Sequence, residues 1–358
     1  MGKKKILFVV EAMGGGVFTY IVDLSNRLSE KYDVSIAHGI REQTPKDYKS
    51  YFNPRVHLYK VENFVREIQL SKDARAFCEI QHIAQEVKPD IIHLHSSKAG
   101  VLGRFAFNGK KIPLFYTPHG YSFLMEDCGK AKRIVFKTIE WICAKRSCTT
   151  ISCSAGEHFE SQKLTSHALC VDNGVNREEL QHILSVTETI EHPFTVFTLG
   201  RICGQKNPEM FNRVAREMPD VRFVWIGDGD SRQVLTAPNI EVTGWIDRLA
   251  AIQKAVSADV FFLPSRWEGL PISLLEAMYM KKICVVSNVV GNRDVIQNGR
   301  NGFVCEHIQE YIDAIRTAQS KNCIDLVNAA QNDILVRYNT QSMAEKYDEI
   351  YIAALLKN

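Results

Sequence analysis

The sequence lacks the features that would place it across a membrane. No apolar run reaches the ~18 residues that a bilayer-spanning helix needs. The amino terminus, Met1-Gly-Lys-Lys-Lys5, leads into the apolar run Ile6–Val10. That run is too short for the core of a secretory signal, and no small-residue cleavage site follows it. We therefore expect no export, no transmembrane segment and a cytoplasmic location.

Paired cysteines are also missing. The chain has ten cysteines, yet none lies in a Cys-x-x-Cys pair, and most lie inside apolar runs, as Cys143, Cys170 and Cys284 do. Scattered thiols of this kind are typical of a reducing compartment and not of a disulfide framework. Their spacing also argues against a zinc site or a catalytic cysteine.

The chain does have the length for two domains and an uneven charge. Its 358 residues exceed what one hydrophobic core usually supports. Residues 1–172 hold 25 Lys and Arg against 18 Asp and Glu, a net charge of +7, and the remainder carries −4. The basic first half favours an anionic partner. The small total charge and the lack of a readout motif argue against nucleic acid.

Short apolar runs alternate with helical patterns along the whole chain. In the first half we expect strands at 4–10, 33–37, 56–61, 91–94, 114–117 and 149–152, and helices at 17–31, 73–87 and 130–146. In the second half we expect strands at 194–199, 221–226, 239–242, 260–263 and 283–287, and helices at 208–217 and 272–280. This rhythm predicts an α/β fold with parallel sheets covered on both faces.

The pattern restarts near residue 190, which divides the chain. The polar stretch Asn176–Pro193 is the expected linker. We place a Rossmann-like N-terminal domain on residues 1–172 and a second Rossmann-like domain on 173–342. The final helical segment, 343–358, could pack back on the first domain.

Two loops at strand ends have the composition of phosphate sites. Glu11-Ala-Met-Gly-Gly-Gly16 joins the first strand to the first helix, where glycines and a helix N-terminus allow backbone contact with an anion. A tight turn explains the same residues. In the second half, Arg201 and Lys206 are expected at the carboxyl edge of the sheet. Arg201 can donate two parallel hydrogen bonds to phosphate oxygens, and Lys206 provides a compact positive charge. A solvated basic loop is the alternative there.

Two carboxylates follow a later strand, in Arg266-Trp-Glu268-Gly-Leu-Pro-Ile-Ser-Leu-Leu-Glu276. Glu268 is expected in the loop and Glu276 about one turn inside the next helix, which Pro271 can start. Two carboxylates on one rim can each hold a pair of vicinal hydroxyls, one of a hexose and the other of a ribose. Apolar neighbours indicate that Glu276 is buried, and a buried carboxylate needs a partner.

His119, in Tyr116-Thr-Pro-His119-Gly-Tyr121, ends a strand of the first half. It lies where two facing domains would meet, as a hydrogen-bond donor or a proton carrier. A purely structural role is the alternative.

A metal site is not expected. His93 and His95 share one face of a strand but lack a third ligand, so we expect them to pack, with one ligand contact from Ser96 or Lys98. The Asp228-Gly-Asp230 triplet could hold a divalent cation, yet its place in a Gly-rich turn favours turn chemistry.

The segment Lys130–Arg146 carries six Lys or Arg and one acidic residue, Glu140, interleaved with apolar residues and Trp141. Such a helix can lie on an anionic membrane surface. It can equally pack its apolar side on the sheet, and the pattern alone leaves both interpretations open. The charge of the first half favours the membrane.

Taken in order, these motifs resemble glycosyltransferase family 4, a group of retaining enzymes. The most specific element is Glu268-x7-Glu276 with its flank Pro264-Ser-Arg-Trp-Glu-Gly-Leu-Pro271. Its companions are Asn173-Gly-Val-Asn176, Gly200-Arg201 with Lys206, Gly227-Asp-Gly229 and the run from Val290 to Gly302. The resemblance covers essentially the whole chain and implies a GT-B fold, in which two Rossmann-like domains face each other across a cleft.

The resemblance also implies roles for single residues. Arg201 and Lys206 would bind the donor diphosphate, Glu276 the ribose and Glu268 the transferred sugar, which His119 would reach from the other domain. Further donor contacts would come from Gly15, Gly16, Gly227, Trp245, Ile246, Gly269, Leu270 and Pro271, with Trp245 and Ile246 framing the base. Two departures affect this picture: apolar residues follow the first glycines, and Asp294 stands where Glu is usual.

The implied function is retaining transfer of a sugar from a nucleoside-diphosphate donor, a UDP-sugar, to a saccharide or polyprenyl-linked saccharide. It belongs to capsule, exopolysaccharide or O-antigen synthesis, needs no metal cofactor and suits a protein peripheral to the inner face of the cell membrane. Because no second carboxylate is placed as a nucleophile, we favour attack on the same face, with the leaving phosphate accepting the proton.

Three other functions share parts of this pattern. A GT-B sugar-nucleotide 2-epimerase is opposed by the flank of Glu268-x7-Glu276. An NAD-dependent oxidoreductase is opposed by the run Ala37-His38-Gly39, which has no acidic residue for the cofactor ribose. A non-catalytic transferase subunit is opposed by the intact charged residues.

Overall fold

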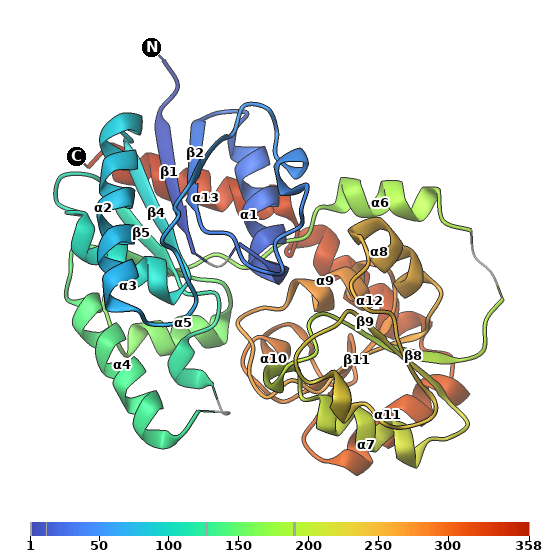
Figure 1. The fold of residues 1–358 in the computed structure, drawn as a ribbon. Coiled ribbons are helices and arrows are strands. Elements are labelled where there is room, and N and C mark those ends of the chain that lie inside the picture. The colour runs from blue at the N-terminus through green and yellow to red at the C-terminus, as the bar shows by residue number, and fades with distance from the viewer. Residues whose placement is uncertain (1, 12, 126–127, 189–190, 358) are drawn as a thin grey trace. The chain divides into compact units, whose positions relative to one another are not determined.

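The computed structural model describes residues 2–11, 13–125, 128–188 and 191–357 and divides the chain into two compact units (Figure 1). Unit 1 holds the described residues of 2–124, 128–173 and 340–357, and unit 2 holds those of 174–339 together with Met125. The chain enters unit 2 after Asn173 and returns to unit 1 after Asn339.

Unit 1 is a seven-stranded sheet in the order β3-β2-β1-β4-β5-β6-β7, and all of its paired strands are parallel. The strands are β1 (Lys5–Val10), β2 (Asp33–His38), β3 (His57–Lys60), β4 (Ile91–His95), β5 (Leu114–Thr117), β6 (Thr149–Ser152) and β7 (Ala168–Cys170). Ile6 to Val10 of β1 are completely buried, as a strand covered on both faces requires. This strand lies beside β4, with Val10 paired to His95, and the carboxyl ends of both strands meet at one edge.

Helices cover both faces of this sheet. They are α1 (Gly15–Leu28), α2 (Leu70–Val87), α3 (Ser97–Ala106), α4 (Lys130–Ala144), α5 (Ala155–Gln162) and α13 (Thr340–Leu355), with the short 3₁₀ helices η1 (Tyr48–Tyr51) and η2 (Ser122–Leu124). Residues of α1 and α13 pack in one core cluster, and residues of α2 and α3 in another. The carboxyl-terminal helix α13 therefore completes the face that α1 covers.

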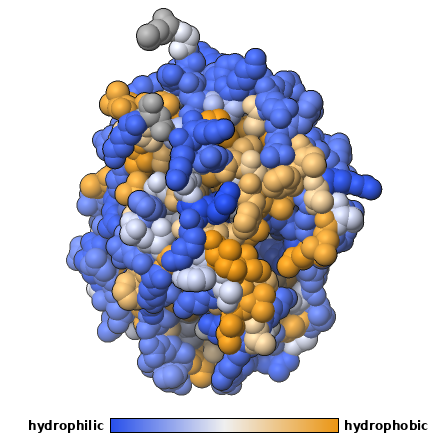
Figure 2. Space-filling model, turned by 90° about the vertical axis from the view of Figure 1, so that its left-hand side faces the viewer, coloured by the Kyte–Doolittle hydropathy of each residue, from blue (hydrophilic) through white to orange (hydrophobic). Residues whose placement is uncertain are grey.

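Helix α4 lies at the surface of unit 1. Of its residues, only Glu140 and Cys143 are buried, and Glu140 pairs with the buried Arg104 of α3 at 2.7 Å. Ile134 and Val135 are 65% and 53% exposed, whereas Phe136 and Ala144 pack against the core of unit 1, so only part of the apolar side of this helix is covered. Figure 2 shows apolar surface between hydrophilic regions on this side of unit 1. Among the described residues, no helix is long and apolar enough to cross a membrane.

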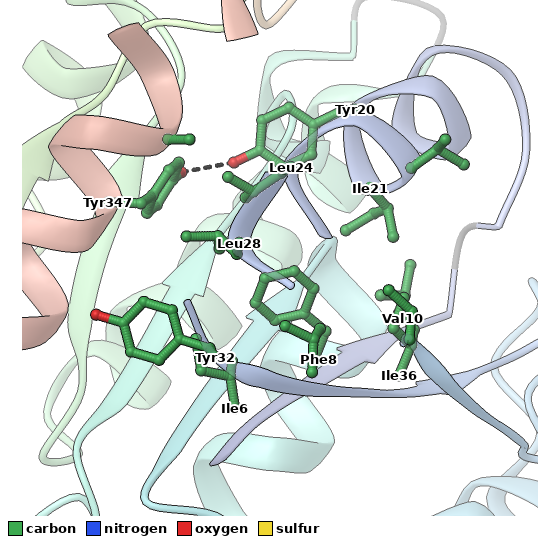
Figure 3. Packing of buried hydrophobic residues seen from close by; sticks show 14 of the residues in the cluster. Ile6, Phe8, Val10, Tyr20, Ile21, Leu24, Leu28, Tyr32, Ile36 and Tyr347 are labelled. Carbon is green, nitrogen blue, oxygen red and sulfur yellow. Dashed lines mark hydrogen bonds between the residues drawn. The ribbon is translucent and has the colours of Figure 1, made fainter. Parts of the chain in front are cut away.

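Figure 3 shows the core between β1, α1 and α13. Phe8 of β1 packs in one cluster with Ile21 and Leu24 of α1, which repeat at helical spacing. Where this core meets α13, the Tyr20 hydroxyl donates a hydrogen bond to the Tyr347 hydroxyl at 2.6 Å. The bond satisfies two hydroxyl groups that would otherwise be buried at a cost.

Unit 2 repeats the architecture with a six-stranded parallel sheet in the order β10-β9-β8-β11-β12-β13. Its strands are β8 (Thr195–Leu199), β9 (Arg222–Ile226), β10 (Ile240–Val242), β11 (Val260–Leu263), β12 (Ile283–Ser287) and β13 (Phe303–Cys305). Its helices are α6 (Arg177–Ser185), α7 (Pro208–Glu217), α8 (Arg248–Val256), α9 (Ile272–Tyr279), α10 (Asn292–Val295), α11 (Ile308–Ser320) and α12 (Ile324–Val336), with η3 (Gly204–Lys206) and η4 (Arg232–Val234). The reversal of strand order between β8 and β11 is a topological switch point, where α/β sheets bind ligands.

The expected α/β fold with two parallel sheets is confirmed, and most predicted elements are present within a few residues of their expected ends. The strands β7 and β13 and the helix α6 were missed, and the helices α3, α5, α8, α10, α11 and α12 had not been given ranges from the sequence. The interpretation of Asn176–Pro193 as a linker was wrong in its first half, because α6 occupies Arg177–Ser185. The Asn176 side chain caps this helix by accepting from the Glu179 N–H at 3.1 Å, so the polar residues that suggested a linker are a helix start.

Candidate active site

The loop after β8 is held against the end of β9. Gly200 donates its N–H to the Ile226 carbonyl at 3.0 Å and accepts from the Trp225 indole at 2.8 Å. Gly227 has φ +137°, and a Cβ there would lie 2.3 Å from the Gly200 carbonyl oxygen, so this close approach requires glycine. Within the part of the chain that the structure describes, the half-buried Arg201 guanidinium has no hydrogen bond or ion pair. This cation is available to a ligand.

Lys206 and Glu268 meet directly in unit 2. The Lys206 Nζ lies 2.7 Å from Glu268 Oε1, and the Ser265 hydroxyl donates to the same oxygen at 2.7 Å. The Gln205 amide donates to the other carboxylate oxygen at 3.2 Å. Glu268 is only 5% exposed, so three donors hold a nearly buried carboxylate in one orientation.

Glu276 lies in α9 and is 2% exposed, as its apolar neighbours predicted. Its partner is Arg248, the first residue of α8, at 2.7 Å. Arg248 also forms a two-pronged pair with Glu179 of α6, at 2.7 and 2.9 Å. Burial raises the pKa of Glu276, and Arg248 acts in the opposite direction. Glu276 is thus a buried carboxylate whose ionised form depends on one arginine.

The loop from Gly269 to Pro271 joins Glu268 to α9. Leu270 and Pro271 are buried, and Pro271 is the residue before the first turn of α9, not its first residue. Gly291, at φ +86°, approaches this loop so closely that a Cβ would lie 2.4 Å from the Gly269 carbonyl oxygen. The glycine of the Val290–Gly302 element therefore packs on the loop that carries Glu268.

Trp245 and Ile246 follow β10, after Gly244 at φ +74°. Trp245 is 59% exposed and Ile246 is also exposed, so a planar ligand can reach the indole. In the neighbouring turn, Asp228 accepts from the Gly229 N–H at 2.9 Å and pairs with Arg232 at 2.9 Å. These contacts are the turn chemistry that the sequence favoured for Asp228.

The glycine-rich loop of unit 1 ends at α1. Gly15 has φ +56°, and Gly16 lies in the first turn of α1. Ala12, which also belongs to this loop, is outside the described residues. Glu11 is buried and pairs with Arg41, with 2.5 Å between Glu11 Oε2 and Arg41 Nη2. The Glu11 carboxylate is therefore paired with the loop that carries Arg41 and anchors that loop to the end of β1.

His119 adopts φ +55°, uncommon for a residue with a side chain, and the next residue, Gly120, donates its N–H to Glu157 at 2.6 Å. His119 Nε2 lies 3.1 Å from His95 Nδ1. His93 and His95 are completely buried, so the packing expected of them is confirmed. Lys98, expected to be able to contact a ligand, instead pairs with Asp73 at 2.7 Å.

Several residues at these sites were not found from the sequence: Arg248, Glu179, Gln205, Ser265, Arg41 and Glu157. Gln205 and Ser265 lie beside recognised motif residues, and that adjacency was the one available signal. The sequence contains no signal for Arg248, because its partners Glu276 and Glu179 lie 28 and 69 positions away along the chain.

The chain matches two family models. Residues 14–179 match the one described as Glycosyltransferase Family 4, and residues 193–321 match Glycosyl transferases group 1. A UDP-Gal:alpha-D-GlcNAc-diphosphoundecaprenol alpha-1,3-galactosyltransferase of Escherichia coli is 30% identical, over 90% of both chains. An N,N'-diacetylbacillosaminyl-diphospho-undecaprenol alpha-1,3-N-acetylgalactosaminyltransferase of Campylobacter jejuni is 24% identical, over 77% of this chain and 80% of that one.

Solved structures agree on the fold. Sucrose-phosphate synthase from Thermosynechococcus elongatus superimposes with a TM-score of 0.85 at 15% identity, over 99% of this chain and 100% of that one. HepE of Anabaena, in complex with UDP and glucose, gives 0.77 at 18% identity, over 98% and 100%. None of these similarities supports an epimerase, an oxidoreductase or a non-catalytic subunit. The chain belongs to glycosyltransferase family 4 and is a glycosyltransferase with the GT-B fold.

Proposed function

We propose that this enzyme transfers a sugar from a UDP-sugar to a saccharide carried on diphosphoundecaprenol, forming an α-1,3 linkage in cell-surface polysaccharide synthesis. The observation that carries the proposal is the 30% identity to the Escherichia coli galactosyltransferase over nine-tenths of both chains. The Campylobacter jejuni relative has a different sugar in its name but the same lipid diphosphate and the same linkage. Galactose is therefore the first donor sugar to test.

The contacts within unit 2 suit a UDP-sugar. Arg201 and Lys206 would neutralise the diphosphate, and Glu276, fixed by Arg248, would accept hydrogen bonds from the ribose hydroxyls. Glu268 would hold the transferred sugar, and Trp245 would stack on the base. Backbone groups of Gly15, Gly16, Gly227 and Gly269–Pro271 would add contacts to phosphate or sugar.

The reaction would retain the anomeric configuration. The acceptor hydroxyl oxygen attacks C1 on the face that the diphosphate leaves, the bond from C1 to the phosphate oxygen breaks, and its electron pair stays on UDP. The proton of the hydroxyl passes to that phosphate oxygen. Arg201 and Lys206 supply the positive charge that stabilises the leaving group, so we propose that no metal cofactor takes part.

The acceptor lipid would bring the enzyme to an anionic membrane, and α4 offers a surface for it. Ile134, Val135, Trp141 and Ile142 are exposed on this helix, among six lysines and arginines between Lys130 and Arg146. Apolar side chains that enter the headgroup region, surrounded by cations, are typical of helices that lie on anionic bilayers. We propose that unit 1 binds the inner face of the cell membrane through α4.

A transfer assay tests the proposal. Purified enzyme is incubated with α-GlcNAc on a short-chain polyprenyl diphosphate and, in turn, UDP-Gal, UDP-GalNAc, UDP-Glc and GDP-mannose. We expect one UDP-sugar to be used, and NMR of the product to show an α-1,3 linkage. A β linkage would refute retention, and use of GDP-mannose alone would refute the UDP donor. The Lys206→Ala enzyme is the matched negative control.

A further inference from the structure

His119 ends a row of three imidazoles in unit 1. The rings of His93 and His95 lie 4.1 Å apart between centroids, and the ring of His119 stacks on that of His95 at 5.3 Å with an angle of 24°. His93 and His95 are fully buried, whereas His119 is half-buried. Only the last ring of the row can therefore meet a ligand.

The role of His119 depends on which of two histidine nitrogens carries the hydrogen atom of the bond between them. His95 Nδ1 and His119 Nε2 lie 3.1 Å apart, and one of them must donate. The other nitrogen of His95, Nε2, is buried and has no hydrogen-bond partner among the described residues. A hydrogen on that Nε2 would leave a buried N–H without an acceptor, which proteins tolerate less often than an acceptor without a donor. The hydrogen of His95 thus belongs on Nδ1.

We infer that His95 is a positioning residue: its Nδ1–H donates to His119 Nε2 and fixes His119 as the tautomer with its hydrogen on Nδ1. His119 then offers a ligand one N–H and no basic nitrogen, because its Nε2 lone pair is already engaged. Of the two roles open from the sequence, donor or proton carrier, this geometry selects the donor. The ligand atom, a hydroxyl oxygen of the transferred sugar, rests on the proposed function, but the tautomer does not.

The residues around His119 keep its ring neutral and fix its orientation. Burial lowers the pKa of His119 to about 3, so the ring is neutral at physiological pH. The Tyr20 ring makes a T-shaped contact with the His119 ring, with 4.6 Å between centroids, and the Tyr20 hydroxyl donates a hydrogen bond to Tyr347 of α13. Glu157 holds the backbone at Gly120. Helix α13, more than 200 residues further along the chain, therefore supports the orientation of His119.

The tautomer can be read directly by NMR. The full chain is labelled with ¹⁵N-histidine, and long-range ¹H–¹⁵N correlation spectra are recorded at pH 7, with His119→Asn used to assign the His119 signals. We expect a protonated, pyrrole-type Nδ1 and an unprotonated, pyridine-type Nε2. The opposite pattern, or a protonated Nε2 on His95, would overturn the inference. This measurement needs no substrate, so it stands even if the proposed function fails.

Two substitutions then test the positioning role. His95→Asn keeps an N–H donor near the position of Nδ1, whereas His95→Leu removes it. We expect His95→Leu to lower kcat about tenfold with little change in the KM for the donor, and His95→Asn to recover most of that loss. Equal kcat values for both variants and the wild type would overturn the role. Should His95→Leu fail to fold, the NMR spectrum of the wild type and the activity of His95→Asn decide the question.

Discussion

Lys206 and Glu268 form an ion pair, with 2.7 Å between Nζ and Oε1, and both side chains are largely buried. The pair joins the residue proposed for the donor phosphate to the one proposed for the transferred sugar. A diphosphate that takes one side of the ammonium leaves its other hydrogens to Glu268, since a lysine has three donors.

Removing this lysine should chiefly slow the chemical step. We expect Lys206→Ala to lower kcat by ~10² or more, because the cation stabilises charge on the departing diphosphate. Steady-state kinetics at saturating acceptor measure the change. Lys254→Ala, which breaks a pair of similar length with Glu241, is the control and should keep normal turnover. Near-wild-type turnover of Lys206→Ala would exclude the proposed role.

Arg248 should be more important for stability than an exposed arginine. Arg248→Met leaves Glu276 buried without its cation, and we expect a loss of about 3–5 kcal/mol in the free energy of unfolding, measured in urea. Arg266→Met breaks the exposed pair with Glu209 and should cost less than about 1 kcal/mol. Adding Glu276→Gln to Arg248→Met should restore part of the loss. Similar losses for Arg248→Met and Arg266→Met would contradict this account.

The histidine row should make the protein sensitive to acid. The pKa of His119 is about 3 in the folded state against an ordinary value of 6.5, so the unfolded chain binds more protons between these pH values. The stabilisation is complete above pH 6.5 and is lost as the pH falls toward 3. His119→Gln should flatten the dependence of unfolding free energy on pH, by up to about 1.4 kcal/mol per pH unit. Urea titrations at pH 5, 6 and 7 measure the slope, and a slope equal to that of the wild type would contradict this account.

Gly227 should tolerate no side chain. We expect Gly227→Ala to destabilise the protein by about 1–3 kcal/mol and to weaken the rise in melting temperature caused by UDP, because the new Cβ would displace the Gly200 carbonyl. Gly299→Ala is the matched control, since Gly299 also has a positive φ, +78°, but no atom lies within 4 Å of a Cβ there. If both variants lose the same stability, backbone strain alone is responsible and the contact is not.

The surface of α4 should bind anionic vesicles. We expect the Ile134→Ser/Trp141→Ser enzyme to sediment less with vesicles that contain phosphatidylglycerol, and binding of the wild type to weaken as salt is added. Ile324→Ser/Leu335→Ser removes two exposed apolar side chains from α12 and should bind as the wild type does. Wild-type sedimentation of the α4 variant would rule out this surface.

The sequence by itself determined the fold class and the local motifs of the enzyme. Buried parallel strands need unbroken apolar runs, and the strands at Leu114–Thr117, Val260–Leu263 and Ile283–Ser287 therefore begin and end where predicted. Glu268 and Glu276 could be singled out for a similar reason, because the residues of a strand-to-helix loop are contiguous in the sequence. The three-residue edge strands β7 and β13 were not predicted, whereas β10, which is equally short and also at an edge, was.

The tertiary structure decided which side chains meet. Arg248 reaches Glu276 and Glu179 because α6 packs against both α8 and α9, and no local pattern records a contact between positions so far apart. The same holds for His119, which follows β5 and whose tautomer depends on His95 at the end of β4. It also holds for α4, whose amphipathic pattern fitted two environments: packing covers Phe136 and leaves Ile134, Val135, Trp141 and Ile142 exposed. Hydrophobic periodicity indicates whether a segment forms a helix or a strand and which of its faces is apolar. The partners, protonation and exposure of individual side chains follow instead from long-range packing.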